Sequence, residues 1–170
     1  MLGCATRIAS THAALVLGGI ILGVAAGPPM ARAGGLLEPA LGASARTAQA
    51  DTKQADDLVN RGNAYADKKD YDRAIADFNQ AIRLDPENAY AYNSRADTLR
   101  EAGKAEQGLP DAGKAVQLDP NNADFWDTRA QILQALGRRQ EAIADYRRAL
   151  ELDPMLTETR ERLKRLGVSR

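Results

Sequence analysis

Cysteine and histidine are almost absent from this chain, whose 170 residues include one of each. Both lie near the start, as Cys4 and His12, so the residues after position 12 carry neither a thiol nor an imidazole. Zinc sites built from Cys and His, thiol nucleophiles and histidine acid–base catalysis therefore have no side chains to use there. A single cysteine also excludes a disulfide within the chain.

Phosphate-binding glycine loops of the GxxxxGK(S/T) or GxGxxG type are missing as well. Basic and acidic side chains number 23 each, so no excess charge favours nucleic acid or a membrane surface as a partner. Carboxylates are numerous, but they recur at the solvent-facing positions of periodic helices. We therefore expect no enzymatic activity, no cofactor and no metal. A hydrolase or a carbohydrate-binding protein is the remaining alternative.

Charge is missing from one long stretch near the N-terminus, between Arg7 and Arg32. Residues 13–26 of that stretch form the apolar run AALVLGGIILGVAA, and a small-x-small motif follows at 31–33. A basic start, a short apolar run and such a motif predict a secretory signal peptide over residues 1–33, so we expect an exported, periplasmic protein. The alternative is an uncleaved helix that anchors the protein to the inner membrane, although the run is shorter than the roughly 20 apolar residues that cross a bilayer.

Residues 34–54 separate this segment from the rest of the chain. They are mostly small and weakly charged, without a helical or strand period. We predict a flexible linker and lead-in there, and a fraying first helix over residues 45–50 is an equally compatible interpretation of its last part.

The remaining residues contain an internal repeat. The triplet Leu-Asp-Pro occurs at 84–86, 118–120 and 152–154, and each copy lies 34 residues from the next. Proline cannot continue a helix and disfavours helical geometry in the residue before it, so each triplet marks the end of a helix at the same phase. A fixed period in this range is typical of a helical repeat array.

Three blocks, 55–88, 89–122 and 123–156, follow this period, and in each the helical spacing of small and apolar residues predicts two helices. The blocks resemble the tetratricopeptide repeat (TPR) family, whose pattern is W-x2-L-G-x2-Y, then A-x3-F, then P. The matching residues are Gly62, Tyr65, Ala74, Phe78, Ala81 and Pro86 in the first block and Trp126, Ala142, Tyr146, Ala149 and Pro154 in the third. The resemblance implies an all-α, right-handed superhelical solenoid of antiparallel helix pairs, with about seven helices and a capping helix at 157–170.

The second block keeps the period but loses bulk in its second half. Ala112 stands where the other blocks have Phe78 and Tyr146, and Pro110 falls where the second helix should already run. Because proline in a helix interior costs about 3 kcal/mol, we predict a helix that starts late, near 109–110, or one that is kinked. A degenerate repeat and a hinge that lets the array flex are both compatible with this pattern.

Two sets of charged residues also follow the 34-residue period. They are Arg61, Arg95 and Arg129, and Asp77, Asp111 and Asp145. We interpret them as structural ion pairs within or between repeats, with a comb that binds a partner as the alternative. The aspartates of the Leu-Asp-Pro triplets are equally available as partners of the arginines.

The resemblance further implies a concave groove that binds a partner segment and is lined by one stripe of each block's first helix. The residues of this stripe are Asp56, Val59, Asn63, Asp67, Tyr90, Asn93, Asp97, Arg100, Glu101, Asp124, Asp127, Gln131 and Gln134. Carboxylates dominate among them, so we expect a protein-binding scaffold with an acidic, polar groove for a segment that bears Lys or Arg. An unliganded, solvated face is the alternative.

One known function of TPR domains, the binding of acidic chaperone tails, can be compared with the residues of this sequence. TPR domains that hold the acidic tails of chaperones use Lys, Asn, Asn, Lys and Arg along this groove. The matching positions here hold Val59, Asn63, Ser94, Asp124 and Thr128. Since only Asn63 fits and the charge is reversed, we expect that the protein is not an acidic-tail receptor of this kind.

Overall fold

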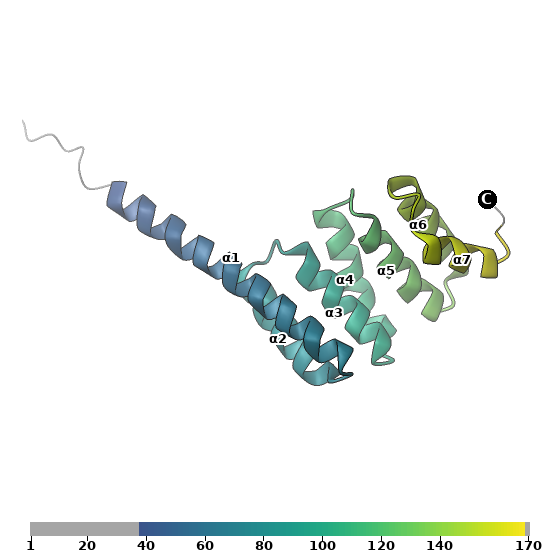
Figure 1. Ribbon diagram of the computed structural model, residues 1–170, viewed down its shortest axis with the longest axis horizontal. Helices are drawn as coiled ribbons and strands as arrows, with labels where there is room; N and C mark the ends of the chain where they lie inside the picture. The colour runs from purple at the N-terminus through teal and green to yellow at the C-terminus, as the bar shows by residue number, and fades with distance from the viewer. Residues whose placement is uncertain (1–37, 169–170) are drawn as a thin grey trace, which may run out of the picture. The chain divides into compact units, whose positions relative to one another are not determined.

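A computed structural model describes residues 38–168 of the chain, and side chains from residue 47 onward. Seven α-helices and no strand occur in that range, arranged as successive antiparallel pairs (Figure 1). They are α1 (Glu38–Asp67), α2 (Tyr71–Leu84), α3 (Ala89–Glu101), α4 (Ala105–Leu118), α5 (Ala123–Ala135), α6 (Arg139–Leu152) and α7 (Thr157–Arg165). The prediction of an all-α helical repeat solenoid is confirmed for these residues. The predicted signal peptide, 1–33, lies outside them.

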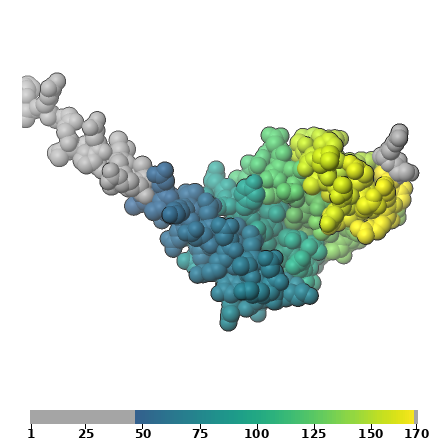
Figure 2. Space-filling view, viewed as in Figure 1, coloured from purple at the N-terminus to yellow at the C-terminus, as the bar shows by residue number. Residues whose placement is uncertain are grey.

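The helices pack in two ways. Within a repeat, α1 packs against α2, α3 against α4 and α5 against α6; between repeats, α3 also contacts both α1 and α5. The last helix, α7, packs against α6 at the end of the stack, shown in yellow in Figure 2. Small residues allow the close approach inside a pair: a Cβ on Gly62 would lie 2.6 Å from the ring of Phe78.

The Leu-Asp-Pro triplets end the second helix of each repeat, as expected. The helices end at Leu84, Leu118 and Leu152, and the following aspartate is the C-cap. Its carboxylate then accepts a hydrogen bond from the backbone N–H two residues further on, over 2.8–3.1 Å. These aspartates therefore stabilise the turns between repeats.

The predicted flexible linker at 34–54 is wrong from Glu38 onward, because α1 begins there and runs for 30 residues without a break. Its early half contains many alanines, which have the highest helix propensity of all residues. Small, weakly charged side chains are compatible with a flexible linker, but alanine favours the helix. Within residues 38–168 no helix combines the length and the apolar character that a membrane crossing requires.

The second helix of the middle repeat does not start late. Helix α4 begins at Ala105 and continues through Pro110. Gly108 supports the close approach of α4 to α3, since a Cβ there would lie 2.7 Å from the carbonyl oxygen of Ala96. Packing against the neighbouring helices thus outweighs the local cost of proline.

Candidate functional site

Two hollows lie along the surface shared by the first helices of the repeats and α7. We call this surface the inner groove. One hollow lies between α1 and α3, and the other is lined by α3, α5 and α7 with one residue of α6. The groove exists because the first helices stand side by side, so that their exposed stripes line up at the 34-residue period.

The first hollow, of about 400 Å³, is acidic and polar. Its lining residues are Asn63, Ala66, Asp67, Lys69, Asn93, Ser94, Asp97, Thr98 and Glu101. Asp67 makes no ion pair within the described residues. The Oδ1 atom of Asn93 is buried and has no hydrogen-bond partner among the described residues. Since a buried acceptor without a donor costs about 1–3 kcal/mol, this atom marks a place where a donor would be favourable. We call this the acidic hollow.

The second hollow, of about 260 Å³, is basic. Its lining residues are Arg100, Gln131, Gln134, Ala135, Tyr146, Arg162 and Arg165, with no carboxylate among them. We call this the basic hollow. Arg100 adjoins both hollows, because its Nε lies 2.8 Å from Oδ1 of Asp97, which lines the acidic one. The groove is therefore divided by charge at the Arg100–Asp97 pair.

Asp127 contacts two residues that line the basic hollow, Gln131 and Arg162, and its carboxylate is fully engaged. Its carboxylate accepts hydrogen bonds from Thr159 Oγ1 at 2.6 Å, Gln131 Nε2 at 2.7 Å and Arg162 Nη1 at 3.4 Å. Two of these donors belong to α7. Asp127 therefore holds α7 in place and does not present a free carboxylate to a partner.

Tyr146 closes the basic hollow from α6. Its hydroxyl donates a 2.9 Å hydrogen bond to Oε1 of Gln134. Burial of the ring raises the pKa of Tyr146 to about 12, and the negative charge of Asp127 adds to that shift. The phenol is thus neutral at physiological pH, and the Gln134 amide nitrogen remains available as a donor.

The structure brings most of the predicted groove residues together, but in two sets. Asn63, Asp67, Asn93, Asp97 and Glu101 line the acidic hollow, and Arg100, Gln131 and Gln134 line the basic one. A single acidic groove is therefore wrong for its α5–α7 part, because the prediction included no residue of α7.

Four predicted residues lie elsewhere. Val59 is 7% exposed and belongs to the core cluster of the first repeat, so no partner can contact it. Asp56 accepts a hydrogen bond from Asn88 Nδ2 at 3.0 Å, and Tyr90 packs edge-on against Phe125. Asp124 is exposed in the first turn of α5 and lines neither hollow.

Sequence reasoning missed several residues that line the groove, among them Lys69 and Tyr146, and the two that change its charge are Arg162 and Arg165. The 34-residue period continues into α7, where Arg162 matches Thr128 and Arg165 matches Gln131. Extending the repeat by one helix would have placed both arginines on the groove stripe. Helix α7 is therefore both a cap of the stack and a part of the groove.

The charged ladders form ion pairs inside each repeat. Their shortest N–O distances are 2.7, 2.6 and 2.7 Å for Arg61–Asp77, Arg95–Asp111 and Arg129–Asp145. Each arginine uses Nε and Nη2 to hold both carboxylate oxygens. The interpretation of these residues as structural ion pairs is confirmed. The partners of the arginines are the aspartates within the second helices, not those of the Leu-Asp-Pro triplets.

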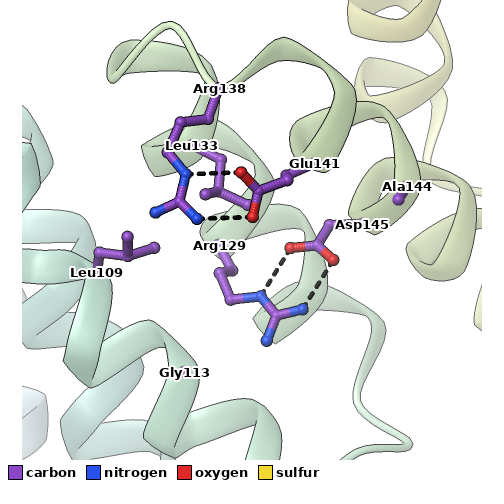
Figure 3. Close-up of a pocket in the computed structure, with 8 residues that line it drawn as sticks. All are labelled: Leu109, Gly113, Arg129, Leu133, Arg138, Glu141, Ala144 and Asp145. Carbon is purple, nitrogen blue, oxygen red and sulfur yellow. Dashed lines mark hydrogen bonds and ion pairs between the residues drawn. The ribbon is translucent and has the colours of Figure 1, made fainter.

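A third hollow, of about 380 Å³, lies outside the groove between α4 and the third repeat (Figure 3). Its charged residues, Arg129, Arg138, Glu141 and Asp145, are paired with one another. The hydrogen bonds between Arg138 and Glu141 raise the pKa of the arginine and lower the pKa of the glutamate. The hollow thus has balanced charge, and Gly113 leaves it open because it has no side chain.

Comparison with known proteins gives matches to one family. Models described as "TPR repeat" and "Tetratricopeptide repeat" match residues 62–106 and 123–155. Stress-induced-phosphoprotein 1 of Caenorhabditis elegans is 41% identical over 63 residues, which are 37% of this chain and 20% of that protein. The chain thus spans about a fifth of that curated relative.

Two solved structures are similar over most of the repeats. The Arabidopsis OM64 TPR domain is 30% identical with a TM-score of 0.65, and the match covers 68% of this chain and 96% of that one. The first TPR of Spaghetti (RPAP3), bound to the HSP90 peptide SRMEEVD, is 28% identical with a TM-score of 0.66, over 68% and 92% of the two chains.

The exclusion of an acidic-tail receptor does not hold against these findings. A domain 28% identical to this chain binds a peptide with two glutamates and a terminal aspartate. The five positions that spoke against such a receptor all lie in the three repeats. The basic residues of α7 are not among them. Arg162 and Arg165 reverse the charge of the groove at that end.

Proposed function

The chain belongs to the tetratricopeptide repeat family, and we propose that it is a non-catalytic scaffold whose inner groove holds an extended segment of a partner protein. Proteins of this family mediate protein–protein interactions. The observation that supports a bound segment here is Asn93, which lines the acidic hollow and whose buried Oδ1 has no hydrogen-bond partner among the described residues.

The segment carries a Lys or Arg at the acidic hollow. Asp67 of α1 and Asn93 and Glu101 of α3 all line this hollow. A cationic side chain is a donor as well as a positive charge, so it would satisfy the orphan acceptor and the free carboxylate of Asp67 together. A neutral segment would leave Asp67 without an ion-pair partner, whereas Asp97 and Glu101 are already paired with Arg100.

The function is exercised in the periplasm. Support for this comes from the apolar run at 13–26 and the small-x-small motif at 31–33, a pattern typical of cleaved secretory signals. Sequencing the N-terminus of the protein from a periplasmic extract tests it: a mature start near residue 34 supports export. An intact N-terminus in the membrane fraction would instead support the anchored alternative.

The groove proposal is tested with the peptide SRMEEVD, which a similar domain binds and which contains one arginine. Titration calorimetry with the full chain should show tighter binding of SRMEEVD than of SAMEEVD. Asp67→Asn should weaken the binding of SRMEEVD but not that of SAMEEVD. The loss of affinity should become smaller as the salt concentration rises. Asp124→Asn removes the same charge outside both hollows and is the matched control. Equal binding of the two peptides at every salt concentration would overturn the Lys/Arg assignment.

A further inference from the structure

We propose that the hollow of Figure 3 is a second binding site, which takes the side-chain carboxamide of an Asn or Gln from a partner protein. This hollow shares no lining residue with the two hollows of the inner groove, so it binds its partner whether or not the groove is occupied. Two repeat boundaries of the same chain point to this ligand, because one boundary contains a carboxamide that the other lacks.

At the boundary between the first and second repeats, an asparagine completes the contacts of the ladder arginine. The guanidinium of Arg95 lies 5.8 Å from the ring centroid of Tyr92 and holds both oxygens of Asp111 through Nε and Nη2. Its third nitrogen, Nη1, donates a 2.6 Å hydrogen bond to Oδ1 of Asn79 in α2. All three nitrogens of this guanidinium therefore have an acceptor.

The next boundary repeats this arrangement without the asparagine. The guanidinium of Arg129 lies 4.7 Å from the ring centroid of Trp126 and holds both oxygens of Asp145 through the same two nitrogens. The residue 34 positions after Asn79 is Gly113, which has no side chain to offer. Within the described residues Nη1 of Arg129 thus makes no hydrogen bond, and Figure 3 shows this nitrogen without a dashed line.

A second free donor lines the same hollow. Arg138 binds Glu141 through Nε and Nη2, at 2.7 and 2.6 Å, so its Nη1 also has no acceptor in the part of the chain that the structure describes. The side chains of Arg138 and Glu141 are 45% and 56% exposed, whereas those of Arg129 and Asp145 are 26% and 8% exposed. The hollow therefore offers two N–H donors, one near the solvent and one deeper.

The charge of the hollow favours a neutral acceptor over an anion. Each guanidinium already holds a carboxylate, so the two ion pairs together carry no net charge. An added carboxylate would lose solvation close to Asp145 and Glu141, whereas a carbonyl oxygen accepts from Nη1 without adding charge. Asn79 shows the preferred group, because it occupies the same place at the preceding boundary.

The remaining walls accommodate the stem that carries the carboxamide. Leu109, Leu133 and Ala144 line the hollow beside the two ion pairs. Its volume of about 380 Å³ is larger than one carboxamide, which leaves space for methylene groups and part of a main chain. The protein side chains that combine a methylene stem with a neutral carboxamide are those of Asn and Gln.

The experiment titrates the full chain with three blocked amino acids and follows the methyl signals of Leu109 and Leu133 by NMR. N-acetyl-asparagine amide is the probe; N-acetyl-leucine amide has a similar shape without the acceptor, and N-acetyl-aspartate amide adds a negative charge. The asparagine compound should bind about two- to tenfold more tightly than the leucine compound, which is the range that one hydrogen bond supplies. The aspartate compound should bind more weakly than the asparagine compound, because its charge faces Asp145 and Glu141.

Two substitutions at one position test where the probe binds. Gly113→Asn supplies an internal carboxamide at the place that Asn79 occupies in the preceding repeat, so it should abolish the binding of the asparagine compound. Gly113→Ala is the matched control. It adds a Cβ that meets no atom within 4 Å and supplies no acceptor, so the asparagine compound should still bind.

Several results would overturn the carboxamide site. One is the absence of any shift of the two leucine signals, and another is equal binding of the leucine and asparagine compounds. Tighter binding of the aspartate compound than of the asparagine compound would show that the hollow selects anions. Equal effects of Gly113→Asn and Gly113→Ala would also contradict the site, because only the first supplies an acceptor. None of these results depends on the inner groove, so the proposed function is tested separately.

Discussion

Thr159 Oγ1 of α7 donates a 2.6 Å hydrogen bond to Asp127 Oδ1 of α5, from 32 residues further along the chain. Thr159 is 1% exposed, so the bond lies inside the contact between the last helix and the third repeat. Arg162 reaches the same carboxylate one turn later. Helix α7 thus does more than cover the end of the stack, because Asp127 aligns it so that its arginines line the groove.

Replacing Thr159 by valine should loosen α7 selectively. The change keeps the shape of the side chain but removes a buried donor, so the Asp127 carboxylate loses its shortest hydrogen bond. We expect a loss of about 1–3 kcal/mol in the stability of α7. Faster amide exchange confined to residues 157–166 is the measurement. Thr157→Val, at an exposed position of the same helix, should leave exchange unchanged; equal effects of both variants would show that the bond is unimportant.

The repeat boundaries were predictable because they depend on local chemistry. Proline cannot continue a helix, so the three Leu-Asp-Pro triplets located the C-terminal ends of α2, α4 and α6, although the predicted start of α4 was wrong. The partner of Arg95 was not predictable in the same way. Asp111 and Asp119 are both near in sequence, and only the crossing of α3 and α4 brings the first within 2.6 Å.

The groove was predictable only in part, for a related reason. Positions on the first three repeats follow from the 34-residue period, and five of them line the acidic hollow. Whether a residue on that stripe is exposed depends on the neighbouring repeat, which is why Val59 is buried. The basic hollow needs Tyr146 from a second helix and two arginines from α7, a combination that no single stripe contains.

Arg95 should be the most sensitive member of the arginine ladder. It holds both oxygens of Asp111 and also donates from Nη1 to Asn79 of the preceding repeat at 2.6 Å. Arg95→Leu leaves a largely buried carboxylate without a counter-charge, so we expect a loss of about 3 kcal/mol in urea unfolding.

Adding Asp111→Asn to that variant removes the unpaired charge and should restore part of the stability. Arg83→Leu, which removes an exposed arginine, is the control. If Arg95→Leu costs no more than Arg83→Leu, the ladder contributes nothing to stability.

Alkaline pH should destabilise the third repeat through Tyr146. Its pKa is raised from 10.0 to about 12, mainly by burial and then by the charge of Asp127. Because the pKa of Tyr146 is higher in the folded state than in the unfolded state, the neutral phenol contributes its full stabilisation below pH 10. It is lost as pH rises towards 12.

Helical circular dichroism and tyrosinate absorbance, followed together from pH 9 to 12.5, check this. Tyr146→Phe cannot ionise at this position, so its alkaline transition should move to higher pH than that of the wild type. Transitions at the same pH would mean that Tyr146 does not drive the loss of structure.

Two glycines of α4 should respond in opposite directions to the same change. A Cβ at Gly113 would meet no atom within 4 Å, because the position borders the hollow of Figure 3. Gly113→Ala should therefore stabilise the protein by about 0.5–1 kcal/mol through helix propensity. A Cβ at Gly108 would lie 2.7 Å from the carbonyl oxygen of Ala96, a backbone atom that cannot move without shifting α3. Gly108→Ala should thus be destabilising despite the same gain in propensity. The midpoints of urea unfolding of the two variants measure the contrast. If both midpoints shift in the same direction, helix propensity rather than the close approach of α3 and α4 determines the stability change.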